Sequence, residues 1–478
     1  MAKNYQTPGV YIEEISKLPA SVAPVETAIP AFMGRTQIAK DENGKDITPS
    51  AAVAPTPIRI TSFLDYQKYF GGPNSEHAIF TTTVADTTEA ATGTVRRMVT
   101  SVADKTAVSG RFLYYAIQMF YANGGGPCYI VSAGNYDTEF SNDDGVATIA
   151  AIAKVDEPTM LIFTDKHDEN NGTTSGYATL YDAALTLCAK LQDRLAIFDP
   201  WIISGNPFQD AVEMRKDEAM DNLKYGCAYY PWLQTVLNYG YSEADLAVVH
   251  QKDGAAGAYD GMNLEAIKTI DLNTYRSIKA ELNKNVIDLP PSSSVAGIMA
   301  RVDNNRGVWK APANESVKMI SGPTVRVTAE QQESLNIDAT TGKSINVIRF
   351  FTGKGTLVWG ARTLAGNDNE WRYISVRRFY NFVEESVKKA SEFVVFEPND
   401  ANTWLRVKTM CENFLNQLWR QGALQGAKPD DAFFVRIGLG ITMTALDILE
   451  GRMNVEIGMA AVRPAEFIIL EFSHKLQE

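Results

Sequence analysis

Two short apolar runs separated by one helical segment constrain the fold of this chain more than any other feature. Residues 160–163 (MLIF) and 195–198 (LAIF) have the length and composition of buried strands, and an Asp follows each run within two residues. Between the runs, apolar residues recur with helical spacing from 177 to 191. This order favours a parallel pair of strands, because parallel strands need a long crossover connection. The sequence therefore predicts an α/β layer and a mixed α/β fold overall.

The length and composition of the chain exclude some classes of protein. Its 478 residues are 45% hydrophobic and 10% aromatic, which is typical of a folded chain, and the length predicts roughly two to four domains. No apolar run approaches the roughly 18 residues that a membrane span needs. The N-terminal residues include no apolar segment typical of a secretion signal, so we expect neither membrane insertion nor classical secretion.

Acidic residues are concentrated in one part of the chain. The net charge is −12, which argues against a nucleic-acid partner because phosphate contacts need a basic surface. Residues 345–478 contain 16 basic and 16 acidic residues, whereas the first 344 residues contain 29 basic and 41 acidic residues. The two parts are therefore expected to face different surroundings.

Both ends of the chain carry β-prone segments with too few neighbouring residues to form a hairpin. Such strands must pair with a distant segment or with another chain. The N-terminal segment consists of Val10, Tyr11, Ile12, Glu13, Glu14 and Ile15. The C-terminal segment consists of Phe467, Ile468, Ile469, Leu470, Glu471 and Phe472.

Other elements are predicted from residue spacing and turn signals. Low hydrophobicity and many small polar residues, including a Thr-rich run, predict surface loops for 36–110. The remaining predictions are strands at 128–131, 227–230, 347–351, 355–359 and 393–396, and helices at 111–122, 209–223, from about 376, and at about 402–421.

The motifs of common catalytic and cofactor sites do not occur in the sequence. Its four cysteines and four histidines are scattered, so no metal or disulfide pattern can be written, and we expect the cysteines to be reduced core residues. Residues 341–344 (TGKS) end like a phosphate-binding loop, but Ile337 stands where that loop needs a glycine. We therefore expect no cofactor and no metal.

Asp165 and Asp199 are the strongest candidates for catalysis. Carboxylates at the ends of neighbouring parallel strands hold metals or acid/base groups in α/β enzymes. A metal-dependent α/β hydrolase that uses both residues is therefore the alternative function. Asp at the end of a strand also caps the following turn or helix. No third ligand or base stands at a useful spacing, which favours the structural role and a protein that is not an enzyme.

Ten short segments, in their order along the chain, resemble the contractile tail sheath protein family of phage tails, R-type pyocins and phage-like injection systems. Each segment alone has little specificity, but the ordered set spans nearly the whole chain. Residues 36–110 and the acidic middle match poorly, which is typical of a variable outer domain. The segments are 7–14 (TPGVYIEE), 31–36 (AFMGRT), 123–131 (NGGGPCYIV), 229–232 (YYPW), 306–314 (RGVWKAPAN), 371–378 (WRYISVRR), 396–400 (FEPND), 418–423 (LWRQGA), 432–435 (AFFV) and 456–467 (EIGMAAVRPAEF).

The resemblance implies a particular domain arrangement. An N-terminal arm (1–20) and a C-terminal arm (464–478) would extend from a core domain formed by 21–35 and 345–478. Residues 36–344 would form an inserted, solvent-facing α/β outer domain, with 36–110 as its poorly matched surface segment. The arm strands of two subunits would join the sheet of a third by backbone hydrogen bonds.

The resemblance also implies a structural subunit that assembles as stacked hexameric rings around an inner tube and contracts to drive the tube through a target envelope. Its partners would be copies of itself, the tube protein, baseplate and terminal cap proteins, and any sheath paralogues. The particle would be made in the bacterial cytoplasm as a phage tail or a tail-like device. The neutral core would line the tube, where the candidate contacts are Lys408, Glu412 and Arg420.

Overall fold

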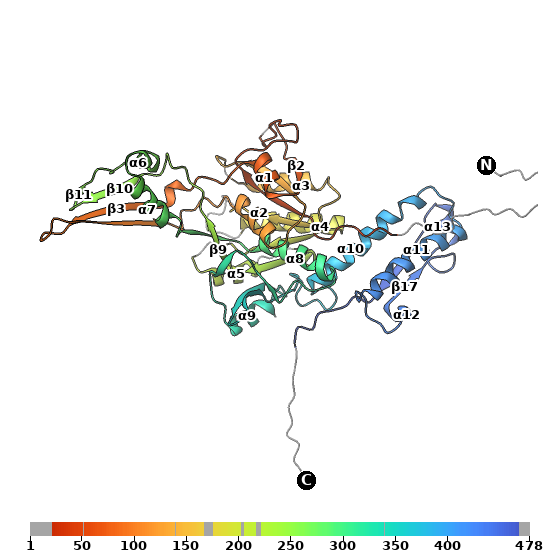
Figure 1. Ribbon diagram of the computed structural model, residues 1–478. Helices are drawn as coiled ribbons and strands as arrows, with labels where there is room; N and C mark the ends of the chain where they lie inside the picture. Colours follow the sequence, from red (N-terminus) through yellow and green to blue (C-terminus); the bar gives the residue numbers. More distant parts are fainter. Residues whose placement is uncertain are drawn as a thin grey trace, which may run out of the picture. The chain divides into compact units, whose positions relative to one another are not determined.

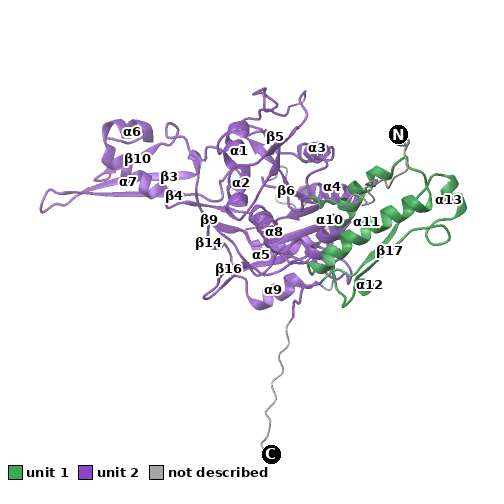
Figure 2. Ribbon diagram, turned by 45° about the vertical axis from the view of Figure 1, so that its right-hand side comes forward, with its two compact units in different colours: residues 1–25, 383–462 green, residues 26–382, 463–478 purple. Residues whose placement is uncertain are grey.

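The computed structural model describes residues 22–50, 52–138, 140–166, 175–201, 205–216, 221–338 and 340–467. These residues belong to two compact units, which Figure 2 distinguishes by colour. Unit 1 comprises 1–25 and 383–462, and unit 2 comprises 26–382 and 463–478. Helices and strands occur together along the chain, which confirms the predicted mixed α/β class.

A nine-stranded sheet forms the centre of unit 2 (Figure 1). In sheet order its strands are β13 (Glu315–Ser316), β16 (Gly355–Val358), β15 (Asn346–Phe351), β8 (Gly226–Tyr230), β7 (Leu195–Phe198), β6 (Met160–Phe163), β1 (Pro30–Thr36), β5 (Cys128–Asn135) and β2 (Pro57–Ile60). The six strands from β15 to β5 are parallel, and the outer strands are antiparallel to their neighbours. The predicted parallel pair, β6 and β7, is confirmed, with α4 (Ser175–Leu191) as its crossover helix.

Helices cover both faces of this sheet. Successive residues of a strand point to opposite faces, so the buried Phe32 and Met33 of β1 belong to two different apolar cores. Phe32 shares its core with α2 (Leu113–Ala122) and α8 (Ser292–Arg306), which pack against each other. Met33 shares its core with α3 (Asn142–Ile152) and α4. The result is a three-layer α/β/α arrangement that buries β1 completely.

A separate four-stranded sheet lies to one side of the nine-stranded sheet in both ribbon views (Figure 1). Its order is β11 (Ala255–Ala256), β10 (Val248–Lys252), β3 (Phe80–Thr88) and β4 (Val95–Ala103). One face is covered by α7 (Leu272–Leu282), which packs on β4 and on α6 (Leu264–Ile270).

The prediction of surface loops for 36–110 is confirmed for the described residues of 37–56, which form turns and isolated bridges, but this second sheet shows that it is wrong for the Thr-rich run. The Thr-rich run begins within β3, and every second residue from Phe80 to Asp86 is buried. Threonine is β-branched and suits a half-buried strand, so low hydrophobicity alone was the wrong criterion. The same region also contains β2 and α1 (Phe63–Phe70), whose N-terminus is closed by a capping box at Ser62.

Unit 2 also contains a third sheet and further helices. A third, antiparallel sheet has the order β12 (Val286–Leu289), β9 (Leu233–Asn238) and β14 (Ile320–Pro323). The helix predicted at 209–223 is shorter, as α5 (Pro207–Lys216). A further helix, α9 (Ala329–Asn336), precedes β15.

Unit 1 is built around two amphipathic helices. α10 (Ile374–Ala390) begins in unit 2 and ends in unit 1, and α11 (Ala401–Arg420) lies wholly in unit 1. The Asp400 carboxylate caps α11 by accepting backbone hydrogen bonds from Asn402 and Thr403. The rest of the unit comprises α12 (Pro429–Ala432), β17 (Phe433–Arg436), α13 (Ala445–Leu449) and β18 (Glu456–Met459).

The strand predicted at 393–396 is wrong. This segment contains a 3-10 turn, η3 (Glu392–Val394), and the Phe396 side chain is fully exposed. Four consecutive apolar residues have the composition of a buried strand, but an isolated strand needs a partner. Among the described residues of unit 1, only β17 and β18 pair as a sheet.

The compact units divide the chain differently from the predicted domains. The prediction joined 21–35 to 345–478 and set 36–344 apart, but β1, β15 and β16 share one sheet with β5–β8. The boundary between units falls inside α10, between residues 382 and 383. Strand pairing across such long separations leaves no local signal in the sequence.

Candidate functional site

Asp165 lies just after β6, beside β1, where the order of the parallel strands reverses. Such a point is where open α/β sheets bind ligands. Here the carboxylate accepts hydrogen bonds from the N–H groups of Phe112 and Leu113 at 3.0 Å and of Arg35 at 2.6 Å. Burial raises the pKa of Asp165, and these donors oppose that shift. The protein's own carboxylate therefore occupies the helix N-terminus that a ligand would need.

Asp199 lies at the end of the neighbouring strand β7 and caps a different helix. Its Oδ1 accepts a hydrogen bond from the Ser292 N–H at 3.0 Å, at the start of α8. Its Oδ2 is buried and has no hydrogen-bond partner among the described residues. Burial raises the pKa of Asp199 to about 7. Each aspartate therefore stabilises its own helix, and the geometry gives no support to a hydrolase that uses both.

Other side chains that could serve catalysis or ligand binding are buried or hydrogen-bonded within the fold. No group of three or more His, Cys, Asp or Glu side chains in the described part of the chain could hold a metal ion. All four cysteines are buried, as predicted. Lys343 and Ser344, in the sequence that resembled a phosphate-binding loop, are buried too, and the Ser344 hydroxyl donates to the Asn336 carbonyl at 2.6 Å.

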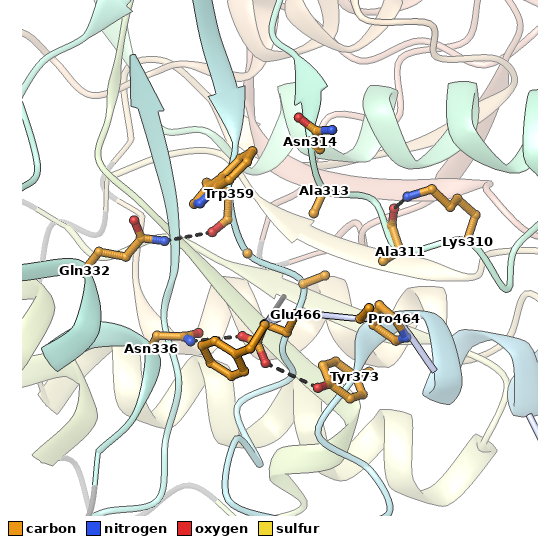
Figure 3. A pocket seen from close by; sticks show the side chains of 14 residues that line it. Lys310, Ala311, Ala313, Asn314, Gln332, Asn336, Trp359, Tyr373, Pro464 and Glu466 are labelled. Atoms are coloured by element: carbon orange, nitrogen blue, oxygen red, sulfur yellow. Dashed lines mark hydrogen bonds between the residues drawn. The ribbon is translucent and has the colours of Figure 1, made fainter. Parts of the chain in front are cut away.

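One cavity of about 370 Å³ opens in unit 2 beside the C-terminal segment (Figure 3). Its walls come from residues 310–314, α9, the end of β16 and residues 464–467. The Glu466 carboxylate accepts hydrogen bonds from two other lining residues, Asn336 at 2.9 Å and Tyr373 at 3.2 Å. Besides Glu466, the titratable side chains of the lining are Lys310 and Tyr373. The cavity therefore lacks a free pair of acid and base groups.

The three candidate tube contacts lie on α11, in unit 1, but only two of them meet. The ammonium group of Lys408 and the carboxylate of Glu412 are 3.7 Å apart, and both side chains are about two-fifths exposed. Arg420 is exposed at the last turn, about 18 Å from Lys408 along the helix axis. The opposite face of α11 is apolar and buried.

The predicted arm strands fall almost entirely outside the described residues. Val10 to Ile15 and Ile468 to Phe472 are not described, and Phe467 is exposed and belongs to no strand. The two-stranded sheet of β17 and β18 is antiparallel and pairs Phe433 with Met459 at one end and Arg436 with Glu456 at the other.

Sequence reasoning missed Arg362, whose buried guanidinium binds Glu466. The two residues are 104 positions apart, so spacing could not connect them. The only available signal was Glu466 itself, a charged residue within the segment 456–467.

No helix in the described ranges is both long enough and apolar enough to cross a bilayer. Among the described residues of unit 1, eight large apolar side chains are more than a third exposed. They are Val395, Phe396, Leu405, Phe434, Leu439, Ile441, Leu446 and Leu449.

Two family models match the second half of the chain. Residues 244–364 match the phage tail sheath protein central domain, and residues 366–475 match the phage tail sheath C-terminal domain. The tail sheath protein of Vibrio phage KVP40 is 21% identical over 250 residues, which are 49% of this chain. The match spans 36% of that relative's length.

Solved structures of sheath proteins match nearly the whole chain, and two of them are described next. One is the sheath complex of an extracellular contractile injection system, PVC, in its contracted state, with 33% identity, a TM-score of 0.62 and 99% of both chains covered. The other is the helical sheath of the anti-feeding prophage (AFP) in its contracted state, with 31% identity and a TM-score of 0.64. That match covers 98% of this chain and 100% of the other.

Proposed function

The chain belongs to the contractile tail sheath family, and we propose that it is the subunit that polymerises in helical hexameric rings around an inner tube and contracts to drive the tube through a target envelope. The observation that carries this proposal is 33% identity to a sheath protein across 99% of both chains. A similarity of that length includes the terminal segments as well as the central sheet.

The arms are proposed to join neighbouring subunits by strand addition. Residues 10–15 of one subunit and 467–472 of another would flank the β17–β18 sheet of a third. A two-stranded sheet is marginal alone, and its free edges are templates for further strands. Backbone hydrogen bonds would supply the affinity, while alternating side chains would set the register. Contacts of this heterologous kind propagate as open helices.

Contraction is then a mechanical change of assembly. Subunits would rotate as rigid bodies and gain contacts, while the arms remain paired as tethers. The exposed apolar side chains of unit 1 support this, because they offer surface that new contacts can bury. A small gain per subunit, summed over many rings, would drive the change without a nucleotide or metal.

The proposed partners are further copies of this chain, an inner tube protein, baseplate and terminal cap proteins, and any sheath paralogues. The neutral C-terminal part would face the tube, and the four-stranded sheet of the acidic part would face solvent. We place its synthesis in the bacterial cytoplasm and its final location in a phage tail or a tail-like particle.

Removal of one arm tests the proposal. A chain without residues 1–15 should fold but form no long sheaths, because one of the added strands is missing. Ile469→Pro should act in the same way by removing one backbone donor, whereas Ile469→Val keeps the donor and should assemble normally. Negative-stain microscopy measures the outcome. Long sheaths of normal diameter from the shortened chain would refute the role of the arm.

A further inference from the structure

The segment that leads into the C-terminal arm returns to unit 2 before it leaves the fold. β18 and Ala461 belong to unit 1, and the assignment changes at Arg463. Between Arg463 and Phe467 the side chains are mostly exposed. Two of them are hydrogen-bonded to other parts of unit 2: Arg463 donates to the Asn369 carbonyl at 2.7 Å, and Glu466 accepts from Arg362, Asn336 and Tyr373. Among the described residues of this segment, Glu466 is the hydrogen-bonded side chain nearest to the C-terminal end.

Glu466 is held by five hydrogen bonds from three side chains. Arg362 contributes Nε at 3.0 and 3.1 Å to the two carboxylate oxygens and Nη2 at 2.6 Å to Oε2. Asn336 donates to Oε1 at 2.9 Å and Tyr373 to Oε2 at 3.2 Å. A forked pairing of this kind fixes direction as well as distance, because a planar guanidinium meets both carboxylate oxygens.

Arg362 follows β16 and is in turn hydrogen-bonded to the nine-stranded sheet. Its side chain is 4% exposed, and its backbone N–H donates to Asn346 Oδ1 at 2.7 Å. Asn346 belongs to β15 and donates to the carbonyls of Ala228 in β8 and of Arg362 itself. Hydrogen bonds therefore connect Glu466, near the start of the C-terminal arm, through the buried Arg362 to the parallel strands β15 and β8.

This pair differs from an ordinary surface ion pair. Arg362 is buried, so without Glu466 its charge would be left in the fold without its carboxylate partner, which is costly. The pKa of Glu466 is lowered by the hydrogen bonds from Arg362 and Asn336, although burial opposes that shift. By comparison, Arg436 and Glu456 in unit 1 are 3.7 Å apart and more than half exposed.

We propose that the Glu466–Arg362 pair anchors the C-terminal arm, so that load passing along the arm between subunits reaches the nine-stranded sheet through Arg362 and Asn346. This inference rests on the proposed function, because it assumes that the arm pairs with a neighbouring subunit. Glu466 is a positioning residue: it fixes where the arm leaves unit 2 and leaves the pairing strand itself unchanged.

A spin label next to Glu466 can test the anchor before any assembly takes place. The four native cysteines are buried, so a cysteine introduced at the exposed Ala465 would take a nitroxide label selectively. In the full-length chain, Glu466→Gln should raise the mobile fraction of the label about tenfold, as expected when a charged hydrogen-bonded pair is lost. Arg362→Lys keeps the positive charge but loses the paired hydrogen bonds to both carboxylate oxygens, so it should give an intermediate increase in the mobile fraction.

Glu281→Gln is the matched control, because it neutralises a solvent-facing pair between Glu281 of α7 and Lys284, outside the proposed arm-binding sheet, and should leave both label mobility and assembly unchanged. Glu466→Gln should also shorten sheaths in negative-stain images at a temperature where circular dichroism shows the variant to be folded, because the unpaired Arg362 is expected to lower its thermal unfolding midpoint. An immobile label in Glu466→Gln would overturn the anchor. A mobile label with sheaths of normal length would overturn its role in carrying load. If the unmodified chain forms no sheaths, the proposed function fails, and the label still reports on the anchor.

Discussion

Asp165 and Asp199 illustrate what single residues reveal in this chain. The sequence placed both at strand ends and favoured capping over catalysis, and the hydrogen bonds to α2 and α8 agree with that interpretation. It could not identify which helices they cap, because α2 lies about fifty residues before Asp165 and α8 about ninety after Asp199. Contacts at such separations follow from the topology of the sheet.

Asp199 should make the stability of unit 2 depend on pH. Burial raises its pKa to about 7 from an ordinary value of 3.8, so the folded state holds the proton more tightly than the unfolded chain. Stability is then lost as the pH rises from about 4 to 7, by up to roughly 1.4 kcal/mol per pH unit. Asp199→Asn cannot ionise and should be more stable than the unmodified chain at pH 8.

Urea unfolding at pH 5, 6, 7 and 8 measures this difference. The two proteins should differ least at pH 5, where Asp199 is mostly protonated, and most at pH 8. Identical pH profiles for the two would show that Asp199 does not titrate in this range.

At the level of elements, amphipathic spacing predicted α10 and α11 well, because each has one continuous apolar face. Composition was a poorer guide. It predicts a loop where β3 lies and a strand at residues 393–396, where the structure has the 3-10 turn η3. In both cases the outcome depended on the neighbours: β4 and β10 pair with β3, while no strand pairs with 393–396 among the described residues.

The exposed face of α11 gives a prediction about the tube. Lys408→Glu should weaken binding to the tube protein if Lys408 contacts it, but it also places two acidic residues four positions apart. The double change Lys408→Glu with Glu412→Lys restores the pair on the helix. If the tube is contacted, both variants should fail to sediment with tubes, whereas rescue by the double change would assign Lys408 to helix stability alone.

For the whole molecule, the ordered set of short motifs was more informative than any single element. It identified the family, which the full-length similarity to sheath structures supports. It did not locate the units, because β1 pairs with β5 and β6, about 100 and 130 residues later, and the unit boundary lies within a continuous helix. The charge division at 344 likewise falls inside unit 2, so it marks a difference in surface and not a boundary of folding.

Cryo-electron microscopy of the assembled full-length chain tests the central claim most directly. We predict tubular polymers of stacked six-membered rings, in which residues 10–15 of one subunit and 467–472 of another extend the β17–β18 sheet of a third. Particles that remain monomeric in the presence of the tube protein, or polymers in which these segments pair only within their own subunit, would contradict it.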